Sequence, residues 1–148
     1  MKLTRTQGNM SSRDENLIRQ ARKARRYAHA PYSKFRVGAA LLSRNGEVFT
    51  GCNVENSSYG LTMCAERTAI FKAISMGEHN FQAIAVVASD PDFTPPCGAC
   101  RQVLWDLAGN IDFVMVNSKG DIRVKKLKSL LPYAFNEKHL HRKKRSKK

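Results

Sequence analysis

Two stretches decide the fold and the chemistry of this chain: Cys64-Ala65-Glu66-Arg67 and, further along, Pro96-Cys97-Gly98-Ala99-Cys100. Their three cysteines offer three thiolates to a metal ion, and zinc is the ion that such soft ligands most often hold. A structural zinc site is closed by four protein ligands, whereas a catalytic site keeps its fourth position for water. Glu66 lies two residues after the first cysteine, where its carboxylate can handle the proton of that water. A lone Cys-x-x-Cys also occurs in redox pairs and zinc knuckles, but the complete pattern predicts a catalytic zinc site.

The length of 148 residues predicts one domain with a sizeable core. No stretch is long and apolar enough to resemble a transmembrane helix, and no apolar core of a secretory signal follows Met1. Metal-bound thiolates suit a reducing compartment. We therefore expect a cytoplasmic protein without membrane association, with the nucleus possible if the source is eukaryotic. An organelle transit peptide is the weaker alternative, because no acidic residue precedes Asp14.

The net charge of +14 is concentrated at the two ends of the sequence. Residues 1–26 hold eight Lys or Arg and two acids, and residues 136–148 hold seven and one, so each end carries +6. Residues 27–135 hold eleven and nine, a balance of +2. We expect a disordered N-terminal extension over residues 1–11, a domain over residues 12–140 and a basic tail over residues 141–148. Such ends can bind nucleic acid weakly, although solvated disorder is the simpler explanation.

The first half of the domain predicts a helix followed by a β-hairpin. Ser12-Arg13-Asp14-Glu15 is a capping-box sequence with Ser12 at the N-cap. The apolar residues after it recur at helical spacing, and Pro31 ends the helical pattern. Residues 37–42 and 47–54 are apolar runs typical of strands, and Asn45-Gly46 between them predicts a tight hairpin turn.

The second half predicts two helices and three strands. Residues 64–76 form a helix that is apolar nearly all round and therefore buried, ending at Gly77. Residues 81–89 predict a central strand, and residues 98–108 a helix whose N-terminus favours cysteine thiolates. Strands over residues 111–116 and 121–124 are joined so closely that they must be antiparallel, and a helical turn follows at residues 127–131. This order predicts a three-layer α/β/α domain with a mixed five-stranded sheet and an antiparallel last strand.

The chain resembles the cytidine deaminases of the small, homotetrameric, all-cysteine zinc type. A zinc ligand followed by Glu and then by Pro-Cys-x-x-Cys is typical of zinc-dependent nucleobase deaminases. The resemblance covers residues 30–140. It rests on five blocks in the right order: Pro31-Tyr32-Ser33-Lys34-Phe35, Gly51-Cys52-Asn53-Val54-Glu55-Asn56, Cys64-Ala65-Glu66-Arg67-Thr68-Ala69, Pro96-Cys97-Gly98-Ala99-Cys100-Arg101-Gln102 and Leu130-Leu131-Pro132-Tyr133-Ala134-Phe135.

The resemblance implies the hydrolytic deamination of cytidine and deoxycytidine to uridine and deoxyuridine plus ammonia, in pyrimidine salvage. It assigns one Zn²⁺ per subunit to Cys64, Cys97 and Cys100, and the proton shuttle to Glu66. Arg67, beside the site, is expected to donate hydrogen bonds to the thiolates and so restore some Lewis acidity to the metal.

The resemblance also implies how a pyrimidine nucleoside is held. Asn53 and Glu55 bind the ribose hydroxyls, and Val54 belongs to the segment of residues 53–59 that lines the pocket. Phe35 packs against the pyrimidine, and the Ala65 backbone N–H contacts the base carbonyl. Two further aromatic residues, Tyr59 and Phe135, enter the active sites of neighbouring subunits, so the homotetramer is part of the site.

Two other functions compete. The basic ends suggest a polynucleotide deaminase, but the short turn at residues 117–120 argues against it, because deaminases resembling the tRNA and DNA editors usually place a helix there. A non-enzymatic zinc module that binds RNA leaves Glu66 and the open metal position unexplained.

Individual residues also have simpler explanations. Arg67 would then form a surface ion pair, and Cys52 would be a small buried residue or a fourth structural ligand. Asn53 and Glu55 would be polar groups at a strand end. The aromatic residues of the site would be core residues, and the four histidines are expected at the surface.

Overall fold

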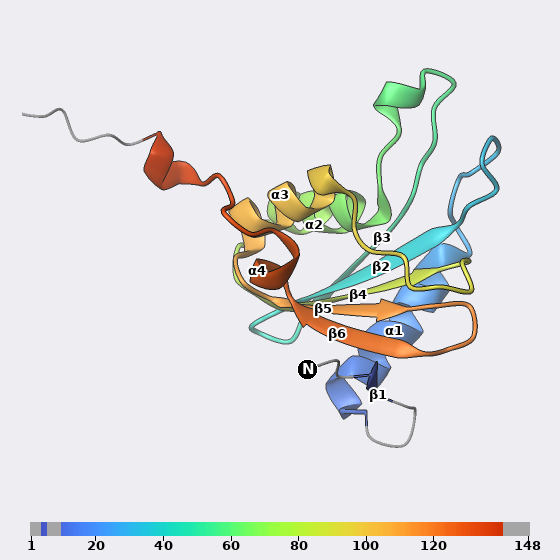
Figure 1. Ribbon diagram of the computed structural model, residues 1–148, viewed down its shortest axis with the longest axis horizontal. Helices are drawn as coiled ribbons and strands as arrows, with labels where there is room; N and C mark the ends of the chain where they lie inside the picture. Colours follow the sequence, from blue (N-terminus) through green and yellow to red (C-terminus); the bar gives the residue numbers. More distant parts are fainter. Residues whose placement is uncertain (1–3, 6–9, 141–148) are drawn as a thin grey trace, which may run out of the picture.

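A mixed sheet separates one helix from two others in the computed structural model, which describes residues 4–5 and 10–140 (Figure 1). The spatial order of the strands is β1-β6-β5-β4-β2-β3. The strands are β1 (Thr4–Arg5), β2 (Val37–Ser43), β3 (Val48–Cys52), β4 (Phe81–Ala88), β5 (Asp112–Val116) and β6 (Ile122–Lys126). The predicted three-layer α/β/α architecture is confirmed.

Strand pairing agrees with the turn signals in the sequence. β2 and β3 are antiparallel across the Asn45-Gly46 turn, where Gly46 adopts a φ of +94° that suits glycine. β4 lies between β2 and β5 and runs parallel to β5, as a buried central strand should. β5 and β6 are antiparallel neighbours. The mixed sheet with an antiparallel last predicted strand is therefore confirmed.

The sheet has one strand more than the sequence predicted. β1 pairs antiparallel with β6, with Thr4 opposite Arg123 and Arg5 opposite Ile122. Without it, β6 would present a row of unpaired backbone groups at the edge of the sheet. Met10 also packs against the apolar cluster beneath α1. The expected disorder of residues 1–11 is thus wrong at these positions, while residues 1–3, 6–9 and the tail at 141–148 lie outside the described part.

The helix on one face of the sheet is α1 (Ser12–Arg25). Its N-cap is Ser11, whose hydroxyl accepts a hydrogen bond from the Asp14 backbone N–H at 3.2 Å. The predicted cap at Ser12 was therefore wrong by one residue, because either serine can cap and the helix begins one position earlier. Leu17, Ile18 and Ala21 on its inner face are buried against the sheet.

Two helices, α2 (Ala65–Ser75) and α3 (Gly98–Ala108), cover the opposite face. The short α4 (Leu127–Leu130) confirms the expected helical turn, and the 3₁₀ turns are η2 (Tyr59–Leu61) and η3 (Glu137–His139). The prediction that α2 is buried all round was wrong. Its sheet-facing alanines are fully buried, but Phe71 is 42% exposed and Lys72 is also exposed, because the sheet covers only one side of the helix.

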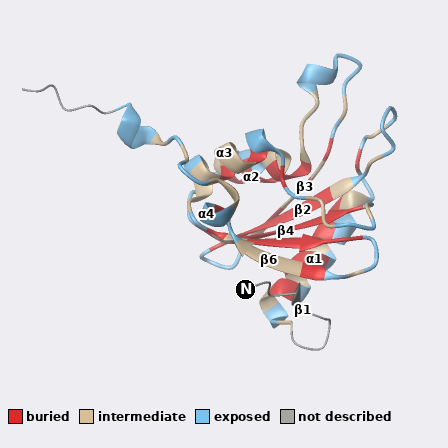
Figure 2. Ribbon diagram, viewed as in Figure 1, coloured by how far each residue is buried: buried red, intermediate tan, exposed pale blue. Residues whose placement is uncertain are grey.

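Buried side chains form two layers, one on each side of the sheet. Figure 2 shows the buried residues along the central strands and on the helices beside them. The layer under α2 and α3 includes Leu104 and Phe113, and the layer under α1 includes Leu17 and Val114. Within the described residues, no helix has the length and apolar character needed to cross a membrane.

Candidate active site

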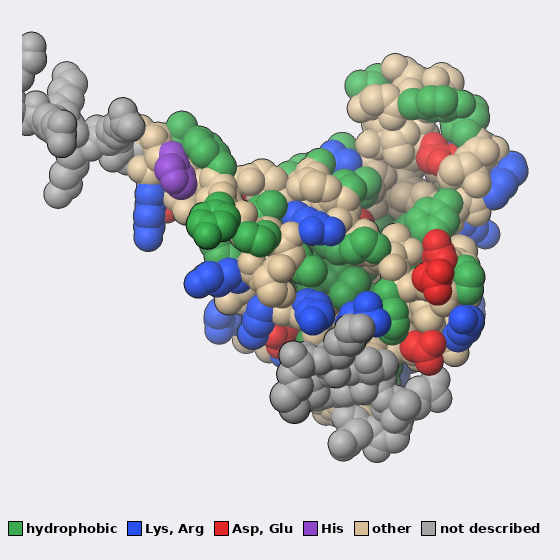
Figure 3. Space-filling view, in the orientation of Figure 1, with side chains coloured by type: hydrophobic (Ala, Val, Ile, Leu, Met, Phe, Trp, Pro, Cys, Tyr) green, Lys and Arg blue, Asp and Glu red, His purple; other side chains and the backbone are tan. Residues whose placement is uncertain are grey.

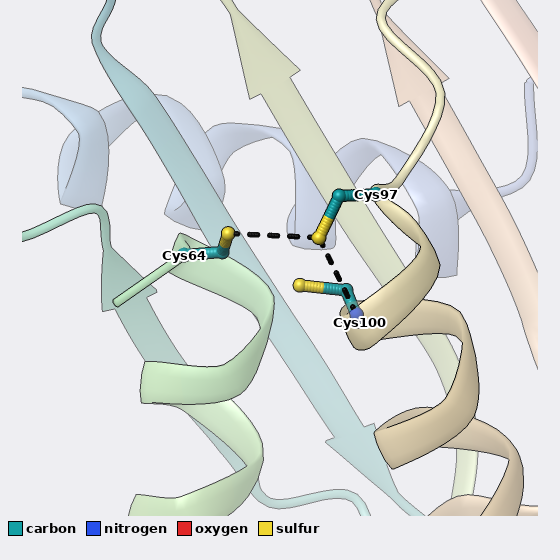
Figure 4. A group of neighbouring side chains, drawn as sticks. All are labelled: Cys64, Cys97 and Cys100. Carbon is teal, nitrogen blue, oxygen red and sulfur yellow. Dashed lines mark hydrogen bonds between the residues drawn. The ribbon is translucent and has the colours of Figure 1, made fainter. Parts of the chain in front are cut away.

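The three motif cysteines meet where α2 and α3 begin (Figure 4). Cys64 is the N-cap of α2, Cys97 is the N-cap of α3, and Cys100 lies in the first turn of α3. Their Sγ atoms all lie within 4.8 Å of one another, and those of Cys64 and Cys97 are 3.8 Å apart. The Cys100 backbone N–H donates to the Cys97 sulfur at 3.4 Å. Two helix N-termini thus bring the three sulfurs together.

The spacing of these sulfurs fits zinc. Zinc lies about 2.3 Å from each sulfur ligand, so two ligands of a tetrahedral site are about 3.8 Å apart. This is the separation of the Cys64 and Cys97 sulfurs. Cys52, half-buried at the end of β3, does not belong to the cluster, which excludes it as a fourth ligand in this arrangement. Three sulfurs leave one position free for a non-protein ligand.

Hydrogen bonds prepare one sulfur of the trio for metal binding. Hydrogen bonds from Cys100 and Arg67 to the Cys64 sulfur lower the pKa of the Cys64 thiol to about 5. The hydrogen bond to Cys64 and burial raise the pKa of the Cys100 thiol. Cys64 and Cys100 therefore share a proton, which a metal ion would displace on binding. Arg67 Nη2 donates to Cys64 Sγ at 3.2 Å, whereas its Nε is buried without a hydrogen-bond partner among the described residues. Arg67 thus contacts the ligand set and forms no ion pair in the described part of the chain.

Glu66 is a buried carboxyl group beside the cysteines. Its side chain belongs to the first turn of α2, and the residue is only 6% exposed. Burial raises the pKa of Glu66 to about 7, and negative charge at Cys64 adds to this rise. A group whose pKa lies near neutrality both accepts and releases protons readily under physiological conditions.

A pocket of about 300 Å³ opens beside Glu66 and Cys97. Phe35, Asn53 and Glu55 form one part of its lining, called here the first wall, and Ala65 and Glu66 in the first turn of α2 form another part, called the second wall. This volume lies at the lower end of the range of small-molecule sites. Sequence reasoning missed Thr62, Thr94 and Pro95 in the lining, because nothing in their local sequence shows which surface they face.

The polar groups of the first wall are held by hydrogen bonds. Asn53 Nδ2 donates to the Phe35 carbonyl at 2.7 Å, and its Oδ1 accepts from the Val37 N–H at 2.8 Å. Glu55 Oε1 accepts from the backbone N–H groups of Tyr32 and Ser33 at 3.0 and 3.1 Å. Hydrogen bonds from Ser33 hold the pKa of Glu55 below its usual value, and the bond from the Ser33 side chain contributes more than the bond from its backbone. An ionised carboxylate therefore faces the pocket.

Three of the expected binding residues lie away from this pocket. Val54 is 43% exposed, and its backbone bridges to His29 and Met63. Tyr59 is 74% exposed and lines an adjoining cavity of about 410 Å³ with Tyr32. Phe135 is 55% exposed and stacks on His139, with ring centroids 5.1 Å apart.

The exposure of these residues tests the simpler explanation that the aromatic residues belong to the core and the histidines to the surface. Tyr59 and Phe135 are not core aromatics, whereas Phe35 is half-buried. The histidines at positions 29, 79 and 139 are exposed as expected, and His141 lies outside the described residues.

Known proteins resemble this chain in sequence and in fold. Residues 11–116 match the family described as "Cytidine and deoxycytidylate deaminase zinc-binding region". A cytidine deaminase of Sporosarcina psychrophila is 50% identical over 127 residues, which are 85% of this chain and 93% of that protein. The crystal structure of a cytidine deaminase from Burkholderia pseudomallei, also 50% identical, gives a TM-score of 0.81 and covers 85% of this chain and 100% of that one. The chain therefore belongs to the cytidine deaminase family, whose members are hydrolases acting on C–N bonds.

Proposed function

We propose that this enzyme hydrolyses the exocyclic amino group of free cytidine and deoxycytidine, releasing ammonia in cytoplasmic pyrimidine salvage. The observation that carries the proposal is that one pocket is lined both by Glu66 and two cysteines of the sulfur cluster and by Glu55, whose pKa is held below its usual value. A carboxyl group beside a zinc site suits proton transfer, and a carboxylate acceptor suits the hydroxyls of a sugar.

In this proposal different residues of the chain bind the metal ion, transfer protons and stabilise the thiolate charge. One zinc ion per subunit, held by the three cysteines, supplies activation of the attacking water. Glu66 takes up one proton of this water and delivers it to N3 of the base as the hydroxide adds to C4. It then carries the second proton from the new C4 hydroxyl to the amino group, so the C4–N bond breaks, ammonia leaves and the C4 carbonyl forms. Arg67 shares the charge of the Cys64 thiolate through its hydrogen bond.

The remaining lining residues hold the nucleoside. The N–H of Ala65 lies in the first turn of α2, where backbone donors have no partner within the helix, so it is suited to the base carbonyl. Phe35 offers an aromatic face to the pyrimidine. Asn53 and Glu55 bind the ribose hydroxyls, the former while bracing Phe35. Val54 contributes through its backbone, which holds this segment against His29 and Met63.

We also propose that the active enzyme is a homotetramer with sites shared between subunits. Tyr59 and Phe135 project from the domain with more than half of their surfaces exposed. In Figure 1 the loop that carries η2 and the C-terminal segment both extend away from the sheet. Large exposed aromatic side chains on projecting segments are suited to contacts with another subunit.

Weak nucleic-acid binding by the basic regions is a secondary part of the proposal. Six of the eight N-terminal cations lie in α1 and its C-cap, which makes the N-terminal charge a fixed surface instead of a tail: Arg13, Arg19, Arg22, Lys23, Arg25 and Arg26. Further Lys and Arg side chains gather near β6 and α4 in Figure 3. Such surfaces attract phosphates through charge alone and carry no base specificity.

Ammonia release from cytidine, deoxycytidine and a cytosine-containing single-stranded oligonucleotide tests the proposed substrate class. We expect turnover of both nucleosides and none of the oligonucleotide. Turnover of the oligonucleotide alone would support polynucleotide deamination, and no turnover of any substrate by zinc-loaded protein would support a binding module.

A further inference from the structure

Gly51 in β3 is pressed against the first turns of α2. A Cβ atom at this position would lie 2.5 Å from the Ala65 carbonyl oxygen, 2.5 Å from the Ala69 nitrogen and 3.0 Å from the Thr68 Cβ. The first two are backbone atoms, so no side-chain rotation relieves the crowding. Its φ lies outside the left-handed region that favours glycine. Gly51 is therefore required for close approach and not for a turn.

This contact lies between the two walls of the pocket. Asn53 and Glu55 follow Gly51 along the chain and form one wall. The second wall includes Ala65, which lies between Cys64 and Glu66 in the sequence. The separation of β3 and α2 at Gly51 therefore determines how far the sugar-binding groups lie from the group that carries the proton.

We infer that Gly51 is a positioning residue for the deaminase reaction: by allowing α2 to lie directly on β3, it places Cys64, Ala65 and Glu66 at their working distance from Asn53 and Glu55. This inference rests on the proposed function for its substrate. Ordinary contact of a Cβ atom begins at 3.4 Å, so a methyl group at Gly51 must increase the separation of β3 and α2 by roughly 1 Å. A misplacement of about 1 Å at a reacting group lowers the rate about 10²-fold.

Gly38 provides a matched control on the opposite face of the sheet. A Cβ atom there would lie 2.1 Å from the Ala21 carbonyl oxygen and 2.5 Å from the Arg25 nitrogen of α1. The crowding is at least as severe and again involves backbone atoms. None of the residues lining the pocket beside Glu66 belongs to α1. Gly38→Ala therefore crowds α1 and leaves the contact between β3 and α2 in place, although the preceding residue, Val37, lines the pocket and donates to Asn53.

The experiment compares Gly51→Ala and Gly38→Ala as purified, zinc-loaded proteins. We expect both variants to lower Tm. Gly51→Ala should lower kcat about 10²-fold relative to wild type, while folded Gly38→Ala, which leaves the contact of β3 with α2 in place, should lose much less of its kcat. Equal losses of kcat in the two variants, or wild-type kcat in Gly51→Ala, would overturn the inference.

A second measurement separates this inference from the proposed function. With Co²⁺ in place of zinc, the d–d absorption bands report ligand geometry without any substrate. A displaced α2 moves Cys64 relative to Cys97 and Cys100, so Gly51→Ala should change these bands and Gly38→Ala should not. Absence of cytidine turnover in wild type would contradict the proposed function alone, whereas unchanged bands in Gly51→Ala would contradict the positioning role.

A pair of milder variants covers the case in which Gly51→Ala does not fold. Ala69 and Ala73 are both fully buried on the sheet-facing side of α2, and Ala69 is the one that contacts the Gly51 position. Ala69→Val should lower kcat and alter the Co²⁺ spectrum more than Ala73→Val, which adds the same bulk one turn further from the site. Equal effects of the two substitutions on both measurements would refute the positioning role.

Discussion

The sulfurs of Cys64 and Cys97 lie 3.8 Å apart although the residues are separated by 33 positions in the sequence. Each is the N-cap of a different helix, and both helices pack on the same face of the sheet. The separation is that of two ligands of one tetrahedral zinc ion. The fold thus brings sulfurs from two helices within reach of one metal ion, so the site depends on each sulfur.

Removing one of these sulfurs should abolish zinc binding. We expect wild type to contain one zinc ion per chain and Cys97→Ala to lose it, because two thiolates cannot hold the ion against competing chelators. Elemental analysis after dialysis measures the content. Cys52→Ala is the control and should retain zinc, because Cys52 lies outside the cluster. Two zinc ions per wild-type chain, or a full complement in Cys97→Ala, would contradict the site.

Glu66→Gln should separate catalysis from folding. The amide keeps the shape of the buried side chain but cannot carry the proton, and one acid–base group typically contributes about 10²–10⁴-fold to a rate. We expect kcat to fall by at least this factor while zinc content and Tm stay near those of wild type. Glu15→Gln, an exposed substitution on α1, serves as the control. If Glu66→Gln kept activity within about tenfold of wild type, Glu66 would not be the proton shuttle.

Phe135 should act in a neighbouring subunit. Phe135→Ala is expected to raise KM and weaken the oligomer, because the exposed ring would no longer fill a partner's pocket. Mixing this variant with Glu66→Gln chains should restore some activity, since sites that contain both native residues can then assemble. Tyr27→Ala removes an exposed aromatic residue that follows α1, away from both projecting segments, and should have no such effect. An absence of recovery after demonstrated subunit exchange would place Phe135 outside the shared site.

A charged cluster between α1 and the sheet should make stability depend on pH. Arg13 Nη2 and Lys126 Nζ lie 3.0 and 2.6 Å from the Asp112 carboxylate oxygens. Burial opposes ionisation of Asp112, but the hydrogen bonds from Lys126 and Arg13 outweigh it and lower its pKa. A carboxylate with a lowered folded-state pKa stabilises the protein above its unfolded pKa of about 3.9, and this stabilisation is lost as pH falls through the folded pKa.

Asp112→Asn should therefore lower Tm at pH 7, with the difference from wild type shrinking progressively below about pH 4. Asp106→Asn, an exposed substitution on α3, is the control for the loss of one negative charge. Thermal unfolding across the pH range measures both variants. A Tm difference for Asp112→Asn that persisted unchanged at the acid end would show that the cluster contributes through packing and not through charge.

The basic face of α1 and the C-terminal tail should increase the affinity for nucleic acid without affecting the turnover of cytidine. Deleting residues 141–148 removes six Lys or Arg and no acid. We expect oligonucleotide affinity, measured by fluorescence anisotropy, to fall with this deletion and further with Arg19→Gln and Arg22→Gln. Binding should weaken steeply with salt, because phosphate contacts release counterions. Cytidine is uncharged, so kcat/KM should remain independent of salt; a salt-dependent kcat/KM would connect these cations to the active site.

Local patterns in the sequence determined most of the elements and identified the three cysteines that the structure brings together. Asn45-Gly46 and the short connection at residues 117–120 specified two antiparallel pairs, because a chain that turns so quickly has no other way to continue. Cys97 and Cys100 identified the start of α3, since that spacing places both sulfurs at one helix N-terminus. These features depend on neighbouring residues alone, and they were predicted correctly.

The tertiary structure decided what depends on distances between remote segments. It alone showed that β1 covers the edge of β6, because pairing at a sheet edge leaves little trace in a two-residue sequence. The near-neutral pKa of Glu66 follows from burial by other elements. Exposure placed Tyr59 and Phe135 outside their own pocket, and the contact of Gly51 with α2 gave a single glycine a role that its sequence neighbours do not reveal. The types of side chain at the site could therefore be read from local sequence, whereas their burial and the distances between them are set by the packing of remote segments.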